Sequence, residues 1–516
     1  MNAFTRSGLT FLACAAGAFA QFPSASAPSS SESSALIPPA SGRSLQTGSV
    51  TAVQQPVPGT TTSVNTLNPS LQVSGNFTGS TPSTVDMPFS GKLSLADALR
   101  RGLAHNLAAV GLKQTIRQNN AQAKAARSAL LPNISGSFSE NVEQIDLATF
   151  GLHFSVPGFA IPTVVGPFNY YSLQASLSQT VANLTSIDNY RSAQATARAS
   201  QYSLDDARDL ITLAVGGAYL QVLAAQARLE AAQVQLNTAN AVFSQSSEQH
   251  QQGVLGRLSV DQNQVRSLTQ EQQLITLRND LAKLKINLAR LTGLPPNAGY
   301  QLTDRFPFSP APVLTVDDAI AQAERQRSDL KAAQTQVEAA AKALSAARAE
   351  RLPSVSLSSD YELLGANPSK TNQAYSAVGT VSIPIWQGGR IGSDVAQAQA
   401  VLAQRQAELE DTRSQIEAEV RQVYLDLQAA AGQVEVARKN LQVAQETLEM
   451  TRTRMEAGVV NTLEVLQAQQ TLSGAQLDLI DSVFAHNLSK LSLARALGHA
   501  SDQLPTLLKP EAQPAN

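Results

Sequence analysis

The sequence contains the same unit twice, and this duplication constrains the fold more than any other feature. The segments that begin at Ser94 and Thr315, "SLADALRRGLAHNLAAVGLKQ" and "TVDDAIAQAERQRSDLKAAQ", match each other. Further along the chain, with a slightly smaller offset, "NLARLTG" matches "SLARALG". Internal repeats of this length indicate two copies of one supersecondary unit. We therefore predict a first copy over residues 91–292, a linker over 293–314 and a second copy over 315–500.

Each copy contains a helix that is too long for an ordinary globular domain. Ser186–Gln252 and Ile391–Ala457 are equally long stretches, and neither contains a proline. At a rise of 1.5 Å per residue, each helix would be about 100 Å long. In the first copy, shorter helices predicted at Ser94–Leu130 and Leu258–Leu291 together have nearly the same length. We therefore expect one long helix to lie beside two short ones stacked head to tail, with coiled-coil-like packing.

Each copy also contains two stretches in which apolar and small polar residues alternate. They are about 10 to 12 residues long, which is the length of a tilted strand that crosses a bilayer, and a small polar face suits a water-filled lumen. An ordinary sheet half covered by helices would show the same alternation. Four strands cannot close a barrel, and lipid does not accept open strand edges. Either the chain pools its strands with copies of itself or the strands are not in a membrane. The apolar positions include Ile134, Phe138, Leu173, Leu177, Val355, Tyr361, Val381 and Ile383.

The chain ends have compositions of their own. Residues 1–20 have a basic start, an apolar core and "AFA" before Gln21, which predicts a signal peptide. Cys14, the single cysteine, lies inside it, and a lipidated Cys14 is the alternative to cleavage after "AFA". Residues 21–90 are rich in Ser, Thr, Pro and Gly and predict a flexible leader, and residues 501–516 predict a loose tail. No later run reaches the length of about 18 apolar residues that a membrane-spanning helix requires.

Charge and motifs argue against several classes of function. The formal net charge is −2, from 40 acidic and 38 basic residues, so we expect no nucleic-acid partner. The five histidines have no metal-site or catalytic-triad spacing, and no phosphate-binding or hydrolase motif occurs. We predict no enzyme, no cofactor and no metal site.

Taken together, several motifs resemble the outer-membrane efflux proteins, the TolC-like channel family. They are "SLADALRRGLAHNL", "RLPSVSLSSD", "IPIWQGGR" and the turns "GVLGRLSVDQNQ" and "GVVNTLEVLQAQ". The resemblance covers about residues 91–500. It implies a mainly α protein with transmembrane β: a homotrimer whose chains pool four strands each into a 12-stranded barrel, above a long periplasmic α-helical tunnel. It also implies a passive exit duct in the outer membrane of a Gram-negative bacterium, which docks a periplasmic adaptor protein and an inner-membrane pump of the RND or ABC type.

The resemblance also assigns roles at the periplasmic end. Where relatives carry an inward acidic residue at the entrance, this chain has Glu464, and Gln467 occupies a second, often acidic position. The corresponding helix start in the first copy has Ser259 and Asp261. Three copies of Glu464 around one axis would favour cations; the alternative is a carboxylate that only opposes a helix dipole. The tip turns expected to contact the adaptor contain Gly253, Val254, Leu255, Gly458, Val459 and Val460.

At the other end, "SIPIWQGGR" separates the last strand from the second long helix. Pro384 cannot donate a hydrogen bond and belongs at a strand end. We expect Trp386 at the membrane interface, and Gly388 and Gly389 to permit the swing from strand to helix. The first copy has "SQTVANLTS" here, so the glycine hinge is predicted for the second copy only. A periplasmic adaptor or a structural coiled-coil protein of the cell envelope is the alternative to the channel. The pattern assigns no role to the apolar loop over residues 150–168.

Overall fold

The computed structural model describes residues 48–57, 66–81, 89–151, 155–156, 159–160, 163–305, 309–310, 314–367, 369–457, 459, 462–498 and 500. The chain divides into two units, Met1–Leu36 and Ile37–Asn516. All described residues belong to the second unit. The predicted signal peptide with Cys14, and the predicted tail over 501–516, lie outside the described residues.

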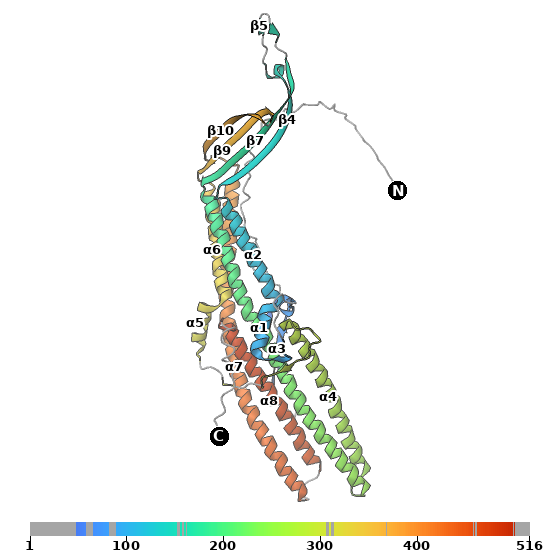
Figure 1. The fold of residues 1–516 in the computed structure, drawn as a ribbon. Helices are drawn as coiled ribbons and strands as arrows, with labels where there is room; N and C mark the ends of the chain where they lie inside the picture. The colour runs from blue at the N-terminus through green and yellow to red at the C-terminus, as the bar shows by residue number, and fades with distance from the viewer. Residues whose placement is uncertain are drawn as a thin grey trace, which may run out of the picture. The chain divides into compact units, whose positions relative to one another are not determined.

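The two predicted long helices are present, and each is followed by an antiparallel partner (Figure 1). The 68-residue helix α3 packs against the next helix along the chain, α4, and the 67-residue helix α7 packs against α8. By composition and length, α3 is the one described helix that could cross a membrane, but most of its apolar window is buried inside the fold. The bounds are α3 Leu184–Gln251, α4 Arg257–Thr292, α7 Arg390–Glu456 and α8 Thr462–Ala496.

The prediction of one continuous helix over Ser94–Leu130 was wrong, because a single extended residue divides it. Asn106 has φ −60° and ψ 134°, and it separates α1 (Leu95–His105) from α2 (Leu107–Ser128). Its side-chain oxygen accepts a hydrogen bond from the Ala108 N–H at 2.9 Å, and its Nδ2 donates to the Phe77 carbonyl at 2.8 Å. An asparagine that caps the second helix therefore compensates for the interruption.

The second copy breaks at the matching position but uses different chemistry. Arg327, the equivalent of Asn106 in the duplication, has φ −59° and ψ 128° and separates α5 (Val316–Gln326) from α6 (Ser328–Ala349). No side-chain hydrogen bond caps α6. Instead, the Arg327 guanidinium is buried among charged partners.

A glycine packs closely against each of the two helix breaks. Gly293 has φ +72°, and a Cβ there would lie 2.7 Å from the Cβ of His105. Gly498, its equivalent in the second copy, has φ +84°, and a Cβ there would lie 2.9 Å from the Cα of Arg327. Only a residue without a side chain meets both the left-handed conformation and the close approach. The end of α4 therefore packs on the first break, and the chain just after α8 packs on the second.

Five chain segments meet in a buried charge cluster at the second break, formed by Asp206 of α3, Arg327, Asp329 of α6, Glu419 of α7 and Arg495 of α8. Arg327 Nη1 lies 2.7 Å from Glu419 Oε2, and Arg327 Nη2 lies 2.6 Å from Asp329 Oδ2. Arg495 also lies 2.7 Å from Glu419, but it is 3.4 Å from Asp206. Three carboxylates thus face two guanidiniums, and Asp206 has the weaker contact.

The cluster shifts the pKa values of two of its carboxylates, Asp206 and Glu419, in opposite directions. Burial raises the pKa of Asp206 to about 6, although the charge of Arg495 opposes the shift. Burial alone would also raise the pKa of Glu419, but the charges of Arg495 and Arg327 more than offset this and hold it below its usual range. Glu419 is therefore the bridging anion, and Asp206 is the carboxyl that is protonated first.

The predicted strands form one antiparallel sheet in the order β10-β9-β7-β4. Directly opposed residues such as Ser135 and Ser176, or Ser376 and Asp360, fix the register. Among the described residues, neither β4 nor β10 has a partner on its outer edge. β7 begins inside the segment predicted as the apolar loop, at Val164, so this strand is longer than expected. The bounds are β4 Asn133–Asp146, β7 Val164–Ala182, β9 Ser354–Asn367 and β10 Lys370–Ser382.

Part of the predicted flexible leader is ordered, which differs from the expectation for residues 21–90. Two paired strands, β1 (Val50–Val57) and β2 (Thr66–Val73), pack against α3 and α8. The physical reason is a notch in α3: Gly217 has no side chain, and a Cβ there would lie 2.8 Å from Leu71 Cδ2. Phe77, just after β2, is fully buried. The composition of residues 21–90 predicted a flexible segment, but contacts of a few apolar residues are enough to hold part of it against the helices.

The two sheet-to-helix connections differ as predicted from the glycines. In the first copy, only Asn183 separates β7 from α3, and its side chain accepts a hydrogen bond from the Ser186 N–H at 3.1 Å. In the second copy, residues 383–389 separate β10 from α7. Gly388 and Gly389 have φ +59° and +87°, so this connection depends on left-handed backbone that other residues adopt at a cost.

We expect Asp206→Asn and Glu419→Gln to differ sharply. The pKa of folded Asp206 lies above that of an unfolded aspartate, so the folded state binds more protons between about pH 4 and 6. Its contribution to stability is lost as the pH rises through about 6. As the pH rises through this range, the free energy of unfolding of Asp206→Asn should therefore increase by about 2 kcal/mol relative to that of the unsubstituted protein. Glu419→Gln should cost about 3 kcal/mol at pH 7.5, because it leaves two buried guanidiniums short of a partner. Thermal unfolding followed by circular dichroism at about pH 4 and at about pH 7.5 measures the difference. Equal losses of stability for both variants at the higher of these pH values would contradict it.

Gly389→Ala and Gly392→Ala form a matched pair that tests the connection in the second copy. A Cβ at either position would have nothing within 4 Å, so sterics do not separate them. Gly389 has positive φ and should lose about 1 kcal/mol of stability, whereas helical Gly392 should gain roughly 0.5–1 kcal/mol. Melting temperatures of the purified variants should move in opposite directions. A stabilising Gly389→Ala would show that the left-handed conformation is not required.

Candidate functional site

The first tip turn connects α3 to α4. Gly253 has φ +76°, and the Val254 N–H donates back to the Gln249 carbonyl at 2.9 Å, as in a glycine-terminated helix. The His250 Nδ1 lies 2.7 Å from the Leu255 carbonyl oxygen and closes the turn. The Val254 side chain is 74% exposed. The turn thus holds an apolar side chain in solvent on a well-bonded backbone.

The second tip turn repeats this backbone pattern where it is described. The Val459 N–H donates to the Arg454 carbonyl at 2.9 Å, with the same spacing as the bond from Val254 to Gln249 in the first turn. Val459 is likewise exposed. Gly458 and Val460 lie outside the described residues. Adaptor contact by either turn stays a prediction.

The four predicted entrance residues lie at the starts of α4 and α8, at the same end of the two helix pairs (Figure 1). Glu464 is exposed in the first turn of α8, and Gln467 is exposed on the same side of that helix. Asp261 lies 3.8 Å from the Arg257 guanidinium. Ser259 is half-buried, and its N–H donates to the Gly256 carbonyl. A carboxylate at the start of a helix is favoured by the helix dipole, so the placement of Glu464 fits both readings, and its gating role stays a prediction.

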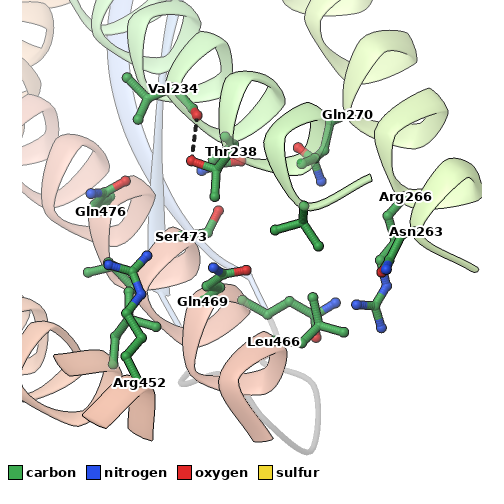
Figure 2. Close-up of a pocket in the computed structure, with 16 residues that line it drawn as sticks. Val234, Thr238, Asn263, Arg266, Gln270, Arg452, Leu466, Gln469, Ser473 and Gln476 are labelled. Atoms are coloured by element: carbon green, nitrogen blue, oxygen red, sulfur yellow. Dashed lines mark hydrogen bonds between the residues drawn. The ribbon is translucent and has the colours of Figure 1, made fainter. Parts of the chain in front are cut away.

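A cavity that the sequence analysis missed separates the two helix pairs near these tips. Its volume is about 390 Å³, and all four helices contribute side chains to it (Figure 2). Asn263, Arg266 and Gln270 come from α4, and Arg452 and Leu448 come from α7. No local motif could mark it, because its walls come from four segments that are distant from one another in sequence.

The sheet has one apolar and one polar face, as the alternation predicts. Ile134, Phe138 and Tyr375 lie on one face and are 66 to 86% exposed. On the other face, the Ser172 hydroxyl donates to Glu362 Oε1 at 2.6 Å, and Gln174 Nε2 donates to Asp360 Oδ1 at 3.2 Å. A sheet with this division suits lipid on one side and water on the other.

The described part of the chain contains no group of three or more His, Cys, Asp or Glu that could hold a metal ion. The predicted hinge residues lie between β10 and α7, as described above, with the Trp386 side chain exposed. The strand itself ends at Ser382, two residues before Pro384, which cannot donate to a neighbouring strand.

The outer membrane efflux protein family matches residues 100–294 and 319–499 of this chain. The chain is also similar to the solved structure of the outer membrane protein VceC from Vibrio cholerae, with 20% identity and a TM-score of 0.66 over 78% of this chain and 96% of that one. For the Campylobacter jejuni CmeC outer membrane channel, the values are 18% identity and a TM-score of 0.67, over 80% and 89%. For the Neisseria gonorrhoeae MtrE outer membrane channel, the identity is 15% and the TM-score is 0.66, over 82% of this chain and 95% of that one. A search of curated proteins found no match.

The two matched segments coincide closely with the two sequence copies, and the similar structures show the same fold. Channels of this family form trimers within tripartite efflux systems, and they are transport proteins rather than enzymes. The readings as a periplasmic adaptor or a structural coiled-coil protein are therefore set aside. The chain belongs to the outer membrane efflux protein family, as an outer membrane channel of tripartite export systems with a periplasmic extension.

Proposed function

We propose that three copies of this chain form one passive exit duct, in which β4 of each copy pairs with β10 of the next. The observation that carries this proposal is the pair of open edges on a sheet with an exposed apolar face. Three copies of the four-stranded sheet provide twelve strands, enough to close a barrel with a lumen. Closure satisfies the backbone groups of both edges, and the apolar face then lies in lipid.

The polar face of the sheet would line the duct. On this face, Asp360 and Glu362 accept hydrogen bonds from side chains of the neighbouring strand β7. These bonds hold the two carboxylates in place on the polar face. Transport energy would come from an inner-membrane pump of the RND or ABC type, and the chain would provide the route.

The tip turns would contact a periplasmic adaptor. Val254 and Val459 are exposed apolar side chains at the ends of the two helix pairs farthest from the sheet (Figure 1). In each turn, the valine N–H donates a hydrogen bond to the carbonyl of the residue five positions earlier. A partner would therefore meet a preformed surface. Exposed apolar residues on ordered turns are a common basis for protein contacts.

Cysteine pairs test the β4–β10 interface directly. In a Cys14→Ser background, Ser137→Cys on β4 is combined in turn with Ser376→Cys, Val378→Cys or Thr380→Cys on β10. Since the shear of the closed barrel sets the register, one of the three pairs should give disulfide-linked dimers and trimers on non-reducing gels of isolated membranes. Ser137→Cys alone should give none. Failure of all three pairs, with the protein folded in the membrane, would contradict the proposed closure.

Glu464→Gln tests the proposed entrance. Three carboxylates around one axis would attract cations, so their removal should lower cation selectivity and shift the reversal potential in a salt gradient toward zero. Planar bilayer recordings measure the shift. Glu410→Gln removes the same charge from the part of α7 nearer the sheet, away from the tip, and should leave the potential unchanged. If Glu464→Gln also leaves it unchanged, its carboxylate only caps α8.

A further inference from the structure

The cavity between the two helix pairs has a cationic lining. Among the described residues that line it are two arginines, Arg266 of α4 and Arg452 of α7, and no aspartate or glutamate. Figure 2 shows the two arginines on opposite sides, with Gln469 and Ser473 of α8 between them. One positive charge therefore comes from each helix pair.

Neither arginine is neutralised by a described carboxylate. The ion pairs of the described residues include neither side chain, although most other arginines of the long helices have an acidic partner. Burial lowers the pKa of Arg266, and no nearby carboxylate opposes this shift. Partial burial of an uncompensated guanidinium is unfavourable, so a ligand that supplied an anion would stabilise it.

Two amide groups at the same cavity also lack partners. The Nε2 of Gln235 and the Oε1 of Gln270 are buried and make no hydrogen bond. Buried polar atoms are normally satisfied, and either amide could present its donor or its acceptor after a flip. The remaining lining includes apolar side chains, among them Val242, Leu448 and Leu466.

We propose that this cavity binds a small organic anion, with its acidic group held by Arg266 or Arg452 and the adjacent amides, and its apolar body against the valine and leucine side chains. The volume of about 390 Å³ lies at the lower end of the range of small-molecule pockets. It is too small for a partner helix, which is about 10–12 Å across with its side chains. Apolar walls with a few convergent polar groups are the usual composition of such a site.

A bound anion would touch both helix pairs at once. If the tips form the entrance proposed above, the ligand would therefore couple α3 and α4 to α7 and α8 just above it. This consequence rests on the proposed function. The binding itself does not, so a binding measurement and a conductance measurement can fail separately.

The probe is 8-anilino-1-naphthalenesulfonate, and its matched control is N-phenyl-1-naphthylamine, which has the same rings without the sulfonate. Full-length protein in lipid nanodiscs is titrated with each, and the signal of empty nanodiscs is subtracted. We expect saturable binding of the sulfonate. Arg266→Gln or Arg452→Gln, whichever removes the arginine that holds the sulfonate, should weaken it about tenfold or more, because a charge-assisted hydrogen bond is lost. Arg266→Lys should retain most of the affinity. Binding of the uncharged probe should change little in all three.

Two further variants make the result specific. Ser473→Phe should block both probes by filling the cavity. Arg421→Gln, which removes an arginine of α7 outside the cavity, should affect neither. The proposal is overturned if the sulfonate does not bind saturably, if both arginine variants bind it as before, or if Arg421→Gln weakens it equally. Intact trimers, checked for each variant by gel migration, exclude misfolding as the cause of a loss.

Discussion

The rest of the structure depends on the two edges of the four-stranded sheet, β4 and β10, which have no partner strand in the part of the chain that the structure describes. β4 and β10 present backbone donors and acceptors along 14 and 13 residues, and each group left unsatisfied in lipid costs several kcal/mol. The loss along even half of one edge would exceed the whole stability of a typical domain. A single chain therefore cannot hold this sheet in a membrane, and the smallest unit that folds there is the closed assembly. The apolar face, exposed in one chain, becomes useful only after closure.

Beneath the sheet, the duplicated chain solves the same packing problem with two different sets of groups. Both copies need a long helix beside two shorter stacked ones, and both break the first short helix at one extended residue. In the first copy, Asn106 caps the next helix and bonds to the Phe77 carbonyl, so the N-terminal segment takes part in the break. In the second copy, Arg327 joins separate chain segments through charge. Elsewhere the copies keep the same contact: the Tyr219 hydroxyl donates to the Leu93 carbonyl, and Tyr424 donates to the equivalent carbonyl of Leu314.

Periodicity predicted most of the fold, because long helices and alternating strands are recorded in local sequence. The two long helices begin and end close to the predicted bounds. Gly388 and Gly389 lie between strand and helix and have positive φ. The breaks at Asn106 and Arg327 were missed because both residues are acceptable within a helix. Each break is also fixed by a partner that is distant in sequence, Phe77 for Asn106 and Glu419 for Arg327. The ordered strands in the leader were missed for a related reason, since composition does not reveal the notch at Gly217. The cavity is the extreme case, because its walls come from four helices and no single segment carries its pattern.

The unequal connections determine which part of the helical wall can change direction independently of the sheet. Only Asn183 lies between β7 and α3, and it caps the helix, so a tilt of α3 must be transmitted to the strand. Between β10 and α7 the chain runs through two left-handed glycines that touch nothing within 4 Å at their missing Cβ. Further down, Glu419 fixes α7 through Arg327 and Arg495. Below the cluster, the Arg228–Asp481 ion pair still ties α8 to α3, so a change of direction between sheet and helix is easiest in the glycine connection above α7. The first copy has no glycine between β7 and α3, so the duplication keeps the long helix in both halves but varies the backbone that joins it to the sheet.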